Sequence, residues 1–270
     1  MWLRTRCYLE FHITEPTPFI FMLRPRSGAQ QWIAYEEYRH APCVAINEFT
    51  DNYGNLCQRL IAPQGKFSIC TTSEVMTSYI SDSCPGAPFI DIPLLPDSAL
   101  SYLLPSRFCE SDKLLNLAVE ITQSYLLGYD QVSAIEQWVR NNIRYDYQGS
   151  ETLLSANEIL QRGVGVCRDL SHLGIALCRS LSIPARLVVG YLYQLEPMDH
   201  HAWFEAYVGG RWYTFDPTQY YKKGGYIAIG YGRDAADVAV FNQFGPPSYP
   251  IAQQIEVELI EDKTFENPVY

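Results

Sequence analysis

Alternate side chains differ in character over the first residues of the chain. One set of alternate positions holds Leu3, Thr5, Cys7, Leu9, Phe11 and Ile13, and the other holds Arg4, Arg6, Tyr8, Glu10 and His12. Successive side chains of a β-strand point to opposite faces, so a period of two separates a buried face from an exposed one. The pattern therefore predicts a half-buried antiparallel strand.

Shorter strand-like segments follow this first one. They lie at residues 44–49, 56–61 and 66–71. The Asn, Asp and Gly residues between the first two segments favour a turn. We interpret residues 1–83 as a small β-sandwich domain.

Prolines interrupt the chain after this β-rich part, and its character then changes. Residues 84–98 contain four of them, at positions 85, 88, 93 and 96. Proline lacks a backbone N–H and fixes φ, so repeated prolines disfavour regular structure. We predict a linker at residues 84–98 and a second domain at residues 99–270.

Apolar residues after the linker recur first at helical spacing and then in strand-like runs. Helices are expected over residues 111–128, 132–143, 155–163 and 167–181, and strands over residues 185–193, 201–208 and 211–215. Ser155 and Glu158 have the spacing of a capping box, which supports a helix start there. The predicted fold class is α+β, with a β-sandwich preceding the mixed domain.

The charge and the apolar content of the chain argue against some classes of binding partner. The chain has 20 basic and 30 acidic residues, a formal charge of -10, and no block of Lys and Arg. Nucleic acid and anionic membrane surfaces are therefore poor partners. The first residues lack the apolar run of a secretory signal, and no later segment is apolar enough to span a bilayer. We expect a cytoplasmic protein, whose eight scattered cysteines are mostly buried thiols.

One cysteine differs from the others by its local context. Cys167 follows the glycine-containing segment 163–166 and precedes an apolar helical pattern. A helix amino terminus concentrates positive potential and unpaired N–H groups, which stabilise a thiolate and a developing oxyanion. Cys167 is therefore the candidate nucleophile.

A predicted hairpin supplies the two partners that such a thiol needs. If Gly209 and Gly210 form a two-residue turn, Val208 pairs with Arg211, and His201 then lies diagonal to Asp216 on the same face. His201 is the candidate base, and Asp216 would orient its ring. A three-residue turn would reverse the parity and separate the two side chains.

Other interpretations of these residues remain open. His200 faces the opposite side of the predicted strand and is the weaker candidate base. Asp199, His200 and His201 together resemble metal ligands by residue type, but consecutive strand residues diverge and no further ligand cluster follows. Taken singly, a cysteine at a helix start, a strand histidine and an Asp-Pro pair are each more often structural.

Several motifs in order resemble a known superfamily. They are Gly163-Val-Gly-Val-Cys-Arg-Asp-Leu-Ser-His172, Ile183-Pro-Ala-Arg186, Gly190-Tyr191, His201-Ala-Trp-Phe-Glu205, Trp212-Tyr-Thr-Phe-Asp-Pro-Thr218 and Gly232-Arg-Asp-Ala-Ala-Asp237. Together they resemble the transglutaminase-like superfamily, and more closely the bacterial transglutaminase-like cysteine proteases that carry an N-terminal β-domain. The segment from Phe19 to Pro25 resembles a strand of that domain.

The resemblance implies a papain-like core and a triad that maps onto Cys167, His201 and Asp216. Family chemistry attacks an amide to form an acyl-thioester, which is transferred to water or to an amine. The chain lacks the loop of acidic ligands that calcium binding would need, and we expect no metal and no cofactor.

Four residues near the predicted triad are candidates for substrate binding. They are Tyr145, Tyr147, Gln148 and Trp203. One of the first three would supply a second oxyanion donor, and Trp203 shares the face of His201, where packing is the stronger alternative. Arg186 and Asp234 are expected to make structural hydrogen bonds.

The predicted function is hydrolysis of a peptide or protein amide by a cysteine protease or amidase. Two alternatives stay open at this point: transfer of the acyl group to an amine, and a non-catalytic scaffold that keeps the fold for peptide binding. The sequence does not choose the acyl acceptor, the substrate or the oligomeric state.

Overall fold

The computed structural model describes residues 1–147, 152–221 and 223–260. Its first part consists of strands, namely β1 (Trp2–Ile13), β2 (Thr17–Arg24), β3 (Gln31–Ala41), β4 (Ile46–Thr50), β5 (Leu56–Ala62) and β6 (Gly65–Thr77). The middle part holds η1 (Ile92–Leu94), α1 (Asp97–Leu100), η2 (Ser101–Leu103), η3 (Ser111–Lys113), α2 (Leu115–Thr122), α3 (Tyr129–Asn142), β7 (Arg144–Tyr145), α4 (Ala156–Arg162), β8 (Val164–Gly165) and α5 (Cys167–Ser180). The last part holds β9 (Ala185–Leu192), β10 (His201–Val208), β11 (Arg211–Phe215), β12 (Tyr226–Gly232), β13 (Phe241–Gln243) and β14 (Pro250–Leu259).

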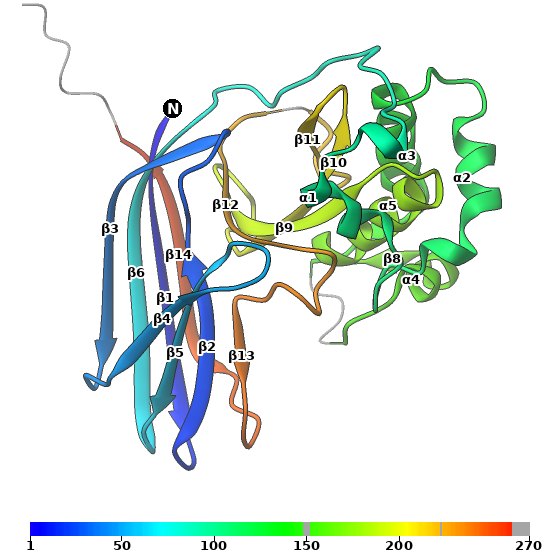
Figure 1. Ribbon diagram of the computed structural model, residues 1–270. Coiled ribbons are helices and arrows are strands. Elements are labelled where there is room, and N and C mark those ends of the chain that lie inside the picture. The colour runs from blue at the N-terminus through cyan, green and yellow to red at the C-terminus, as the bar shows by residue number, and fades with distance from the viewer. Residues whose placement is uncertain (148–151, 222, 261–270) are drawn as a thin grey trace, which may run out of the picture.

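Two antiparallel sheets form the β-sandwich at one end of the molecule (Figure 1). Their strand orders are β14-β1-β6-β3 and β13-β2-β5-β4. The period of two in β1 produces the predicted division, because Leu3, Leu9 and Phe11 are fully buried and Arg4 and His12 are exposed. Rings of phenylalanines from both sheets fill the space between them, with Phe11 and Phe19 centroids 5.3 Å apart.

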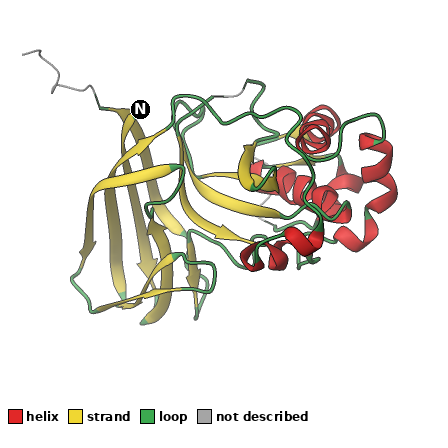
Figure 2. Ribbon diagram, turned by 45° about the horizontal axis from the view of Figure 1, so that its top comes forward, coloured by secondary structure: helices red, strands yellow, loops and turns green. Residues whose placement is uncertain are grey.

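The second unit packs helices against one face of a four-stranded sheet, whose order is β11-β10-β9-β12. In Figure 2 the helices gather on the side of this sheet that faces away from the sandwich. The apolar face of α5, with Leu170, Leu173 and Leu177, lies in the core between the helices and the sheet. The α+β class with a β-rich part before the mixed core is confirmed, and α4 begins with the predicted Ser155 and Glu158 capping box.

The sheet of the second unit also packs on the sandwich. Tyr191 of β9 and Ile227 and Ile229 of β12 are buried in the same apolar core as the sandwich side chains. Gln31 at the start of β3 adds a polar tie, because its side-chain amide accepts from the N–H of Ala228 and donates to the same residue's carbonyl, each at 2.8 Å. The sandwich core therefore extends onto one face of this sheet, while the helices cover a separate core on its other face.

Strand pairing revises one predicted boundary. The prediction assigns residues 99–270 to the second domain, but β13 pairs with β2, and β14 pairs with β1 from Leu3 to Phe11. In β14 only Ile255 and Val257 are buried, so its sequence lacks the sustained alternation that marks β1. The chain thus leaves the sandwich for the second unit and returns to it, and the other predicted limits stay a prediction.

Among the described residues, we find no helix whose length and apolar character would let it cross a membrane.

Candidate active site

Cys167 is the first residue of α5 and is partly buried. Just before it, β8 pairs in parallel with β7, which fixes the direction from which the chain enters the helix. The Asp169 carboxylate accepts a hydrogen bond from the N–H of Val166 at 3.2 Å and so caps the helix start. A Cβ at Gly165 would lie 2.8 Å from the Asp169 Cβ, so the glycine is needed for this cap to form.

The hairpin that carries His201 and Asp216 has the predicted parity. Gly209 and Gly210 form a two-residue turn with φ of +57° and +85°, and Val208 pairs with Arg211. Nε2 of His201 and Oδ2 of Asp216 are 2.7 Å apart, and both side chains are almost completely buried. The predicted diagonal contact is therefore confirmed as geometry, while the catalytic roles stay a prediction.

The pKa of His201 reflects the balance between its burial and its charged neighbours. Burial lowers the pKa of this ring, but the Asp216 carboxylate and the Cys167 side chain outweigh burial and raise it from 6.5 to about 10. Burial raises the pKa of Asp216, and the His201 charge overcomes it and lowers the value below 3.8. His201 is therefore protonated and Asp216 ionised at neutral pH.

The two ring nitrogens of His201 have different surroundings. Nε2 is held by Asp216, whereas Nδ1 is buried and has no hydrogen-bond partner among the described residues. Since Cys167 is close enough to raise the pKa of the ring, Nδ1 is the nitrogen left to exchange a proton with the sulfur.

A set of polar groups that the sequence did not reveal holds Asp216. Its Oδ1 accepts hydrogen bonds from the N–H and hydroxyl of Thr218, and its Oδ2 accepts one from the Tyr226 hydroxyl at 2.9 Å. Its backbone N–H donates to Glu136, and its carbonyl accepts from Arg140 at 3.0 Å. Thr218 was visible as part of a quoted motif, but Glu136, Arg140 and Tyr226 meet Asp216 only through the tertiary fold.

His200 points to the opposite side of the sheet, as the strand period requires. Its Nε2 lies 3.6 Å from Sγ of Cys7 in β1, and its ring packs against Tyr191 with centroids 5.5 Å apart. Burial lowers the pKa of His200 to about 4. His200 therefore belongs to the seam between the two units and not to the Cys167 site.

The predicted substrate-binding residues have different positions. Tyr145 is 41% exposed, and its pKa is raised by burial and by the charges of Cys167 and Asp216. Tyr147 is exposed two residues further on, and Gln148 lies outside the described residues. Trp203 is only 1% exposed and packs between His201 and Tyr226, with ring centroids 6.0 and 4.9 Å away. Trp203 is therefore a packed residue in this structure, and a role in substrate binding stays a prediction.

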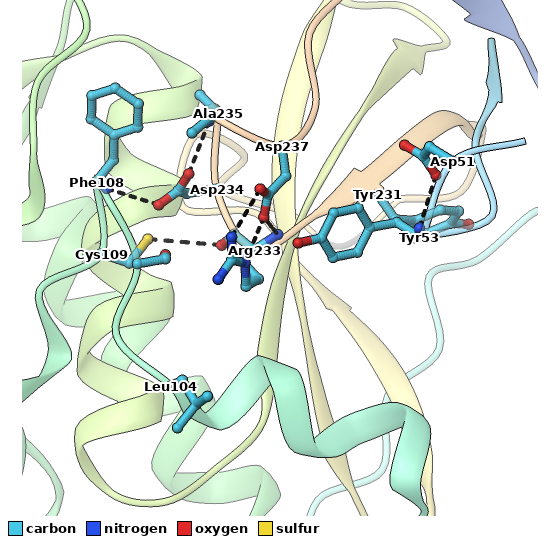
Figure 3. A network of polar contacts seen from close by, with 12 residues as sticks. Asp51, Tyr53, Leu104, Phe108, Cys109, Tyr231, Arg233, Asp234, Ala235 and Asp237 are labelled. Carbon is cyan, nitrogen blue, oxygen red and sulfur yellow. Dashed lines mark hydrogen bonds and ion pairs between the residues drawn. The ribbon is translucent and has the colours of Figure 1, made fainter.

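Arg186 and Asp234 make the structural contacts expected of them. The Arg186 guanidinium pairs with Glu205 at 2.7 Å and lies between the rings of Trp212 and Tyr231, 4.2 Å from each centroid. Figure 3 shows Asp234 accepting a hydrogen bond from the N–H of Phe108 at 2.8 Å. These contacts hold the framework around the site.

His172 of α5 contacts the same segments as Asp234. Its Nε2 accepts a hydrogen bond from the N–H of Ala235 at 3.2 Å, and its ring stacks on Phe108 at 5.4 Å. Arg233 and Asp237 form an ion pair at the next turn of the same segment (Figure 3). His172 is fully buried and held in this way, so it is a structural residue of α5. Within the described part of the chain, no three His, Cys, Asp or Glu side chains are grouped as metal ligands.

Comparison with known proteins identifies the family and the fold. The family model of the transglutaminase-like superfamily matches residues 115–217, which include Cys167, His201 and Asp216. A crystal structure of a candidate cysteine protease from Cytophaga hutchinsonii is 36% identical, with a TM-score of 0.88 over 98% of this chain and 92% of that one. The chain belongs to the transglutaminase-like superfamily, and its fold is of the cysteine-protease and transamidase type.

Two further relatives match by sequence. Protein ML0607 of Mycobacterium leprae (strain TN) is 26% identical over 231 residues, which cover 80% of this chain and 82% of that protein. Protein YebA of Bacillus subtilis (strain 168) is 28% identical over 147 residues, which cover 46% of this chain and 18% of that protein.

Proposed function

We propose that the protein is a thiol-dependent amide hydrolase, a cysteine protease or amidase, in which Cys167 is the nucleophile, His201 the general base and acid, and Asp216 the orienting carboxylate. One observation carries the proposal. A buried carboxylate holds Nε2 of His201 at 2.7 Å, and Nδ1 has no hydrogen-bond partner among the described residues. The Cys167 side chain contributes to the raised pKa of the ring. A ring held in this way can exchange protons only through its second nitrogen.

The first half of the proposed reaction forms an acyl-enzyme. The Cys167 thiolate attacks the amide carbon, and a carbon–sulfur bond forms while the carbonyl oxygen becomes an oxyanion. The His201 imidazolium gives its proton to the amide nitrogen, the carbon–nitrogen bond breaks, and the amine leaves. An acyl-thioester and a neutral imidazole remain.

The second half returns the enzyme to its starting state. The neutral imidazole takes a proton from water, the resulting hydroxide adds to the thioester carbon, and the carbon–sulfur bond breaks. The carboxylic acid leaves, and the thiolate and imidazolium form again. Asp216 keeps the ring in place and stabilises its positive charge throughout.

The oxyanion is stabilised in this proposal by groups at the start of α5. The first N–H groups of a helix have no carbonyl partner within the helix, and α5 begins at the nucleophile itself. The hydroxyl of Tyr145, whose pKa is raised in part by the charge of Cys167, is the candidate second donor. Tyr145→Phe tests this role, because it removes the hydroxyl and keeps the ring.

Selective alkylation tests the proposal directly. Iodoacetamide at neutral pH, followed by mass mapping, should modify Cys167 faster than the exposed thiols of Cys43 and Cys84. His201→Ala should reduce the rate at Cys167 and leave the other two rates unchanged. Equal labelling of the three thiols in the wild type would contradict an activated nucleophile.

Product analysis then separates hydrolysis from transfer. A reporter peptide amide should give free acid in water, and an added primary amine should not divert most of the product. A transamidase would instead give mainly the new amide. Turnover that survives in Cys167→Ala would exclude Cys167 as the nucleophile.

A further inference from the structure

The hairpin strand β11 has a free edge. It is the outermost strand of its sheet and pairs on one side only, with β10. Val208 and Arg211 close the two-residue turn, so the backbone groups of Arg211, Tyr213 and Phe215 point toward β10. Those of Trp212 and Thr214 therefore point outward, away from the sheet.

Bonding on the β10 side supports this assignment. The N–H of Tyr207 donates to the carbonyl of Pro184, on the side of β9, so the neighbouring residues of β10 face β11. The outward groups of Asp216, next in the same series, are occupied because its N–H donates to Glu136 and its carbonyl accepts from Arg140.

The outward groups of Trp212 and Thr214 are different. Within residues 1–147, 152–221 and 223–260, the one hydrogen bond to them comes from the Gln30 side chain to the Trp212 carbonyl, at a long 3.5 Å. Both residues are only half-buried. Two residues of strand backbone thus offer donors and acceptors that the described chain leaves unused.

These groups border a cleft between the two units. A cavity of about 360 Å³ is lined by Trp212, and a second of about 140 Å³ is lined by Thr214. Both are also lined by Gln30 and Asp82, so the two cavities adjoin along β11. An unpaired strand edge beside a cleft is the kind of site to which an extended peptide adds as a strand.

The larger cavity is predominantly basic. Arg26, Arg186 and Arg211 line it, with Asp82 as the single acidic lining residue. Arg211 is paired with Asp82, and Arg186 with Glu205. Arg26 is exposed and donates to the carbonyl of Gly54, with no carboxylate partner among the described residues. In a chain of formal charge -10, this basic cavity favours an acidic ligand.

We propose that an extended, acidic peptide segment of a partner protein binds in this cleft and adds as a strand to the free edge of β11. Its main chain pairs with the outward N–H and C=O groups of Trp212 and Thr214. Its carboxylates face Arg26 and Arg211. The peptide is a docked segment and not the bond that is cleaved.

The position of the cleft supports this distinction. A third, much smaller cavity adjoins the second through Thr214 and Tyr226 and is lined by Asp216. The cleft therefore approaches the triad from the carboxylate side, whereas the sulfur lies beyond the imidazole ring. A partner bound here leaves the thiol side of the site open.

The test uses the full chain with Cys167→Ala, so that hydrolysis cannot consume the probe. The probe is a short, end-capped, fluorescein-labelled peptide of alternating valine and glutamate, and its control replaces glutamate by lysine. Fluorescence anisotropy should show binding of the acidic peptide and at least about tenfold weaker binding of the basic one. Because the test does not use the thiol, its result is independent of the proposed function.

Two variants at one position separate the backbone from the side chain. Thr214→Pro removes an outward N–H without removing a bond to β10, so it should weaken binding about tenfold through the lost hydrogen bond and the bulk of the ring. Thr214→Val keeps the N–H and should bind within about twofold of the parent chain. Thermal unfolding confirms that both variants fold.

The charge contribution is tested separately. Arg26→Glu should weaken binding of the acidic peptide and should reduce the difference between the two peptides. Hydrogen exchange should show that the bound peptide slows exchange at Trp212 and Thr214. The proposal is overturned if the acidic peptide does not bind, if both peptides bind equally, or if Thr214→Pro binds as well as Thr214→Val.

Discussion

Two adjacent histidines, one just before β10 and one at its first position, each face a cysteine, on opposite sides of the same sheet. His201 faces Cys167 and the second unit, and its pKa is raised to about 10. His200 faces Cys7 of the sandwich, and its pKa is lowered to about 4. The comparison shows that a cysteine next to a histidine does not define a reactive pair.

The difference lies in what surrounds each pair. Burial lowers the pKa of both rings, but His201 has a buried carboxylate 2.7 Å from its Nε2, whereas the carboxylate beside His200 is that of the exposed Asp199, 3.8 Å from its Nδ1. Burial raises the pKa of Cys7 to about 12, so its thiol stays protonated and unreactive. Cys167 instead begins a helix and is partly accessible. A buried carboxylate and a helix start thus separate a candidate active site from a structural contact.

Replacing each histidine should give the largest contrast. His201→Ala removes the base and should lower kcat/KM for a peptide amide by about 10³-fold or more. His200→Ala removes a packed ring from the seam and should lower the melting temperature while kcat/KM changes by less than about tenfold. Equal losses of kcat/KM in the two variants would show that His201 has no special role in the reaction.

Removing the carboxylate should make His201 resemble His200. In Asp216→Asn the ring keeps its burial and loses the charge that raises its pKa, so the pKa should fall below 6.5. The ring is then neutral at neutral pH, and kcat should fall by about 10²-fold or more. In the wild type, activity should decline as the pH rises through about 10, and in Asp216→Asn the decline should move to lower pH. An alkaline limb at the same pH in both proteins would exclude His201 as its source.

The same charged pair should contribute to stability, with a defined pH window. A raised histidine pKa stabilises the folded state fully below 6.5, and this contribution is lost as the pH rises through about 10. The lowered pKa of Asp216 contributes above 3.8 and is lost as the pH falls through the folded value. The difference in unfolding free energy between the wild type and Asp216→Asn should therefore shrink as the pH rises from about 6.5 to about 10, and stay level above that. Urea denaturation across this range measures the difference.

Replacing Cys7 should affect mainly stability, and replacing Cys167 should affect mainly turnover. Cys7 is 1% exposed in the sandwich core, so Cys7→Ala should reduce the free energy of unfolding by about 1–2 kcal/mol through the cavity that it leaves. Cys167→Ala should cost less stability and abolish turnover. Chemical denaturation and a kinetic assay on the same two preparations compare the effects.

The smallest expected effect concerns how Asp216 is held. Tyr226→Phe removes the hydroxyl that donates to Oδ2 and keeps the ring that packs on Trp203. We expect kcat to fall about fivefold, corresponding to about 1 kcal/mol, with KM unchanged. A change in KM without a change in kcat would indicate that Tyr226 contacts substrate instead of orienting the carboxylate.

Local patterns in the sequence predicted those parts of the molecule that are determined by nearby residues. The double glycine fixed the hairpin turn, and the parity of β10 then distinguished His201 from His200. The cap of α4 and the start of α5 at Cys167 were likewise predictable, since each depends on residues three positions apart.

Other features depend on partners that are distant in sequence. The contact between Asp216 and Glu136 joins α3 to the end of β11, and no spacing rule relates the two residues. Trp203 was a candidate for substrate binding because it shares a face with His201, but that face is covered by Tyr226. β13 and β14 were missed because their exposed edge positions carry few of the apolar residues that reveal a strand.

The pairing of β14 with β1 has a consequence for how the protein is made. β1 is synthesised before both of its partners; β6 follows early and covers one of its edges, but the partner for its other edge is synthesised only after the whole second unit. During that interval a long strand with alternating apolar side chains presents unpaired backbone to the surrounding solution. Slow or interrupted translation after residue 240 should therefore favour association of nascent chains through β1, even when the unit that carries Cys167 has already folded.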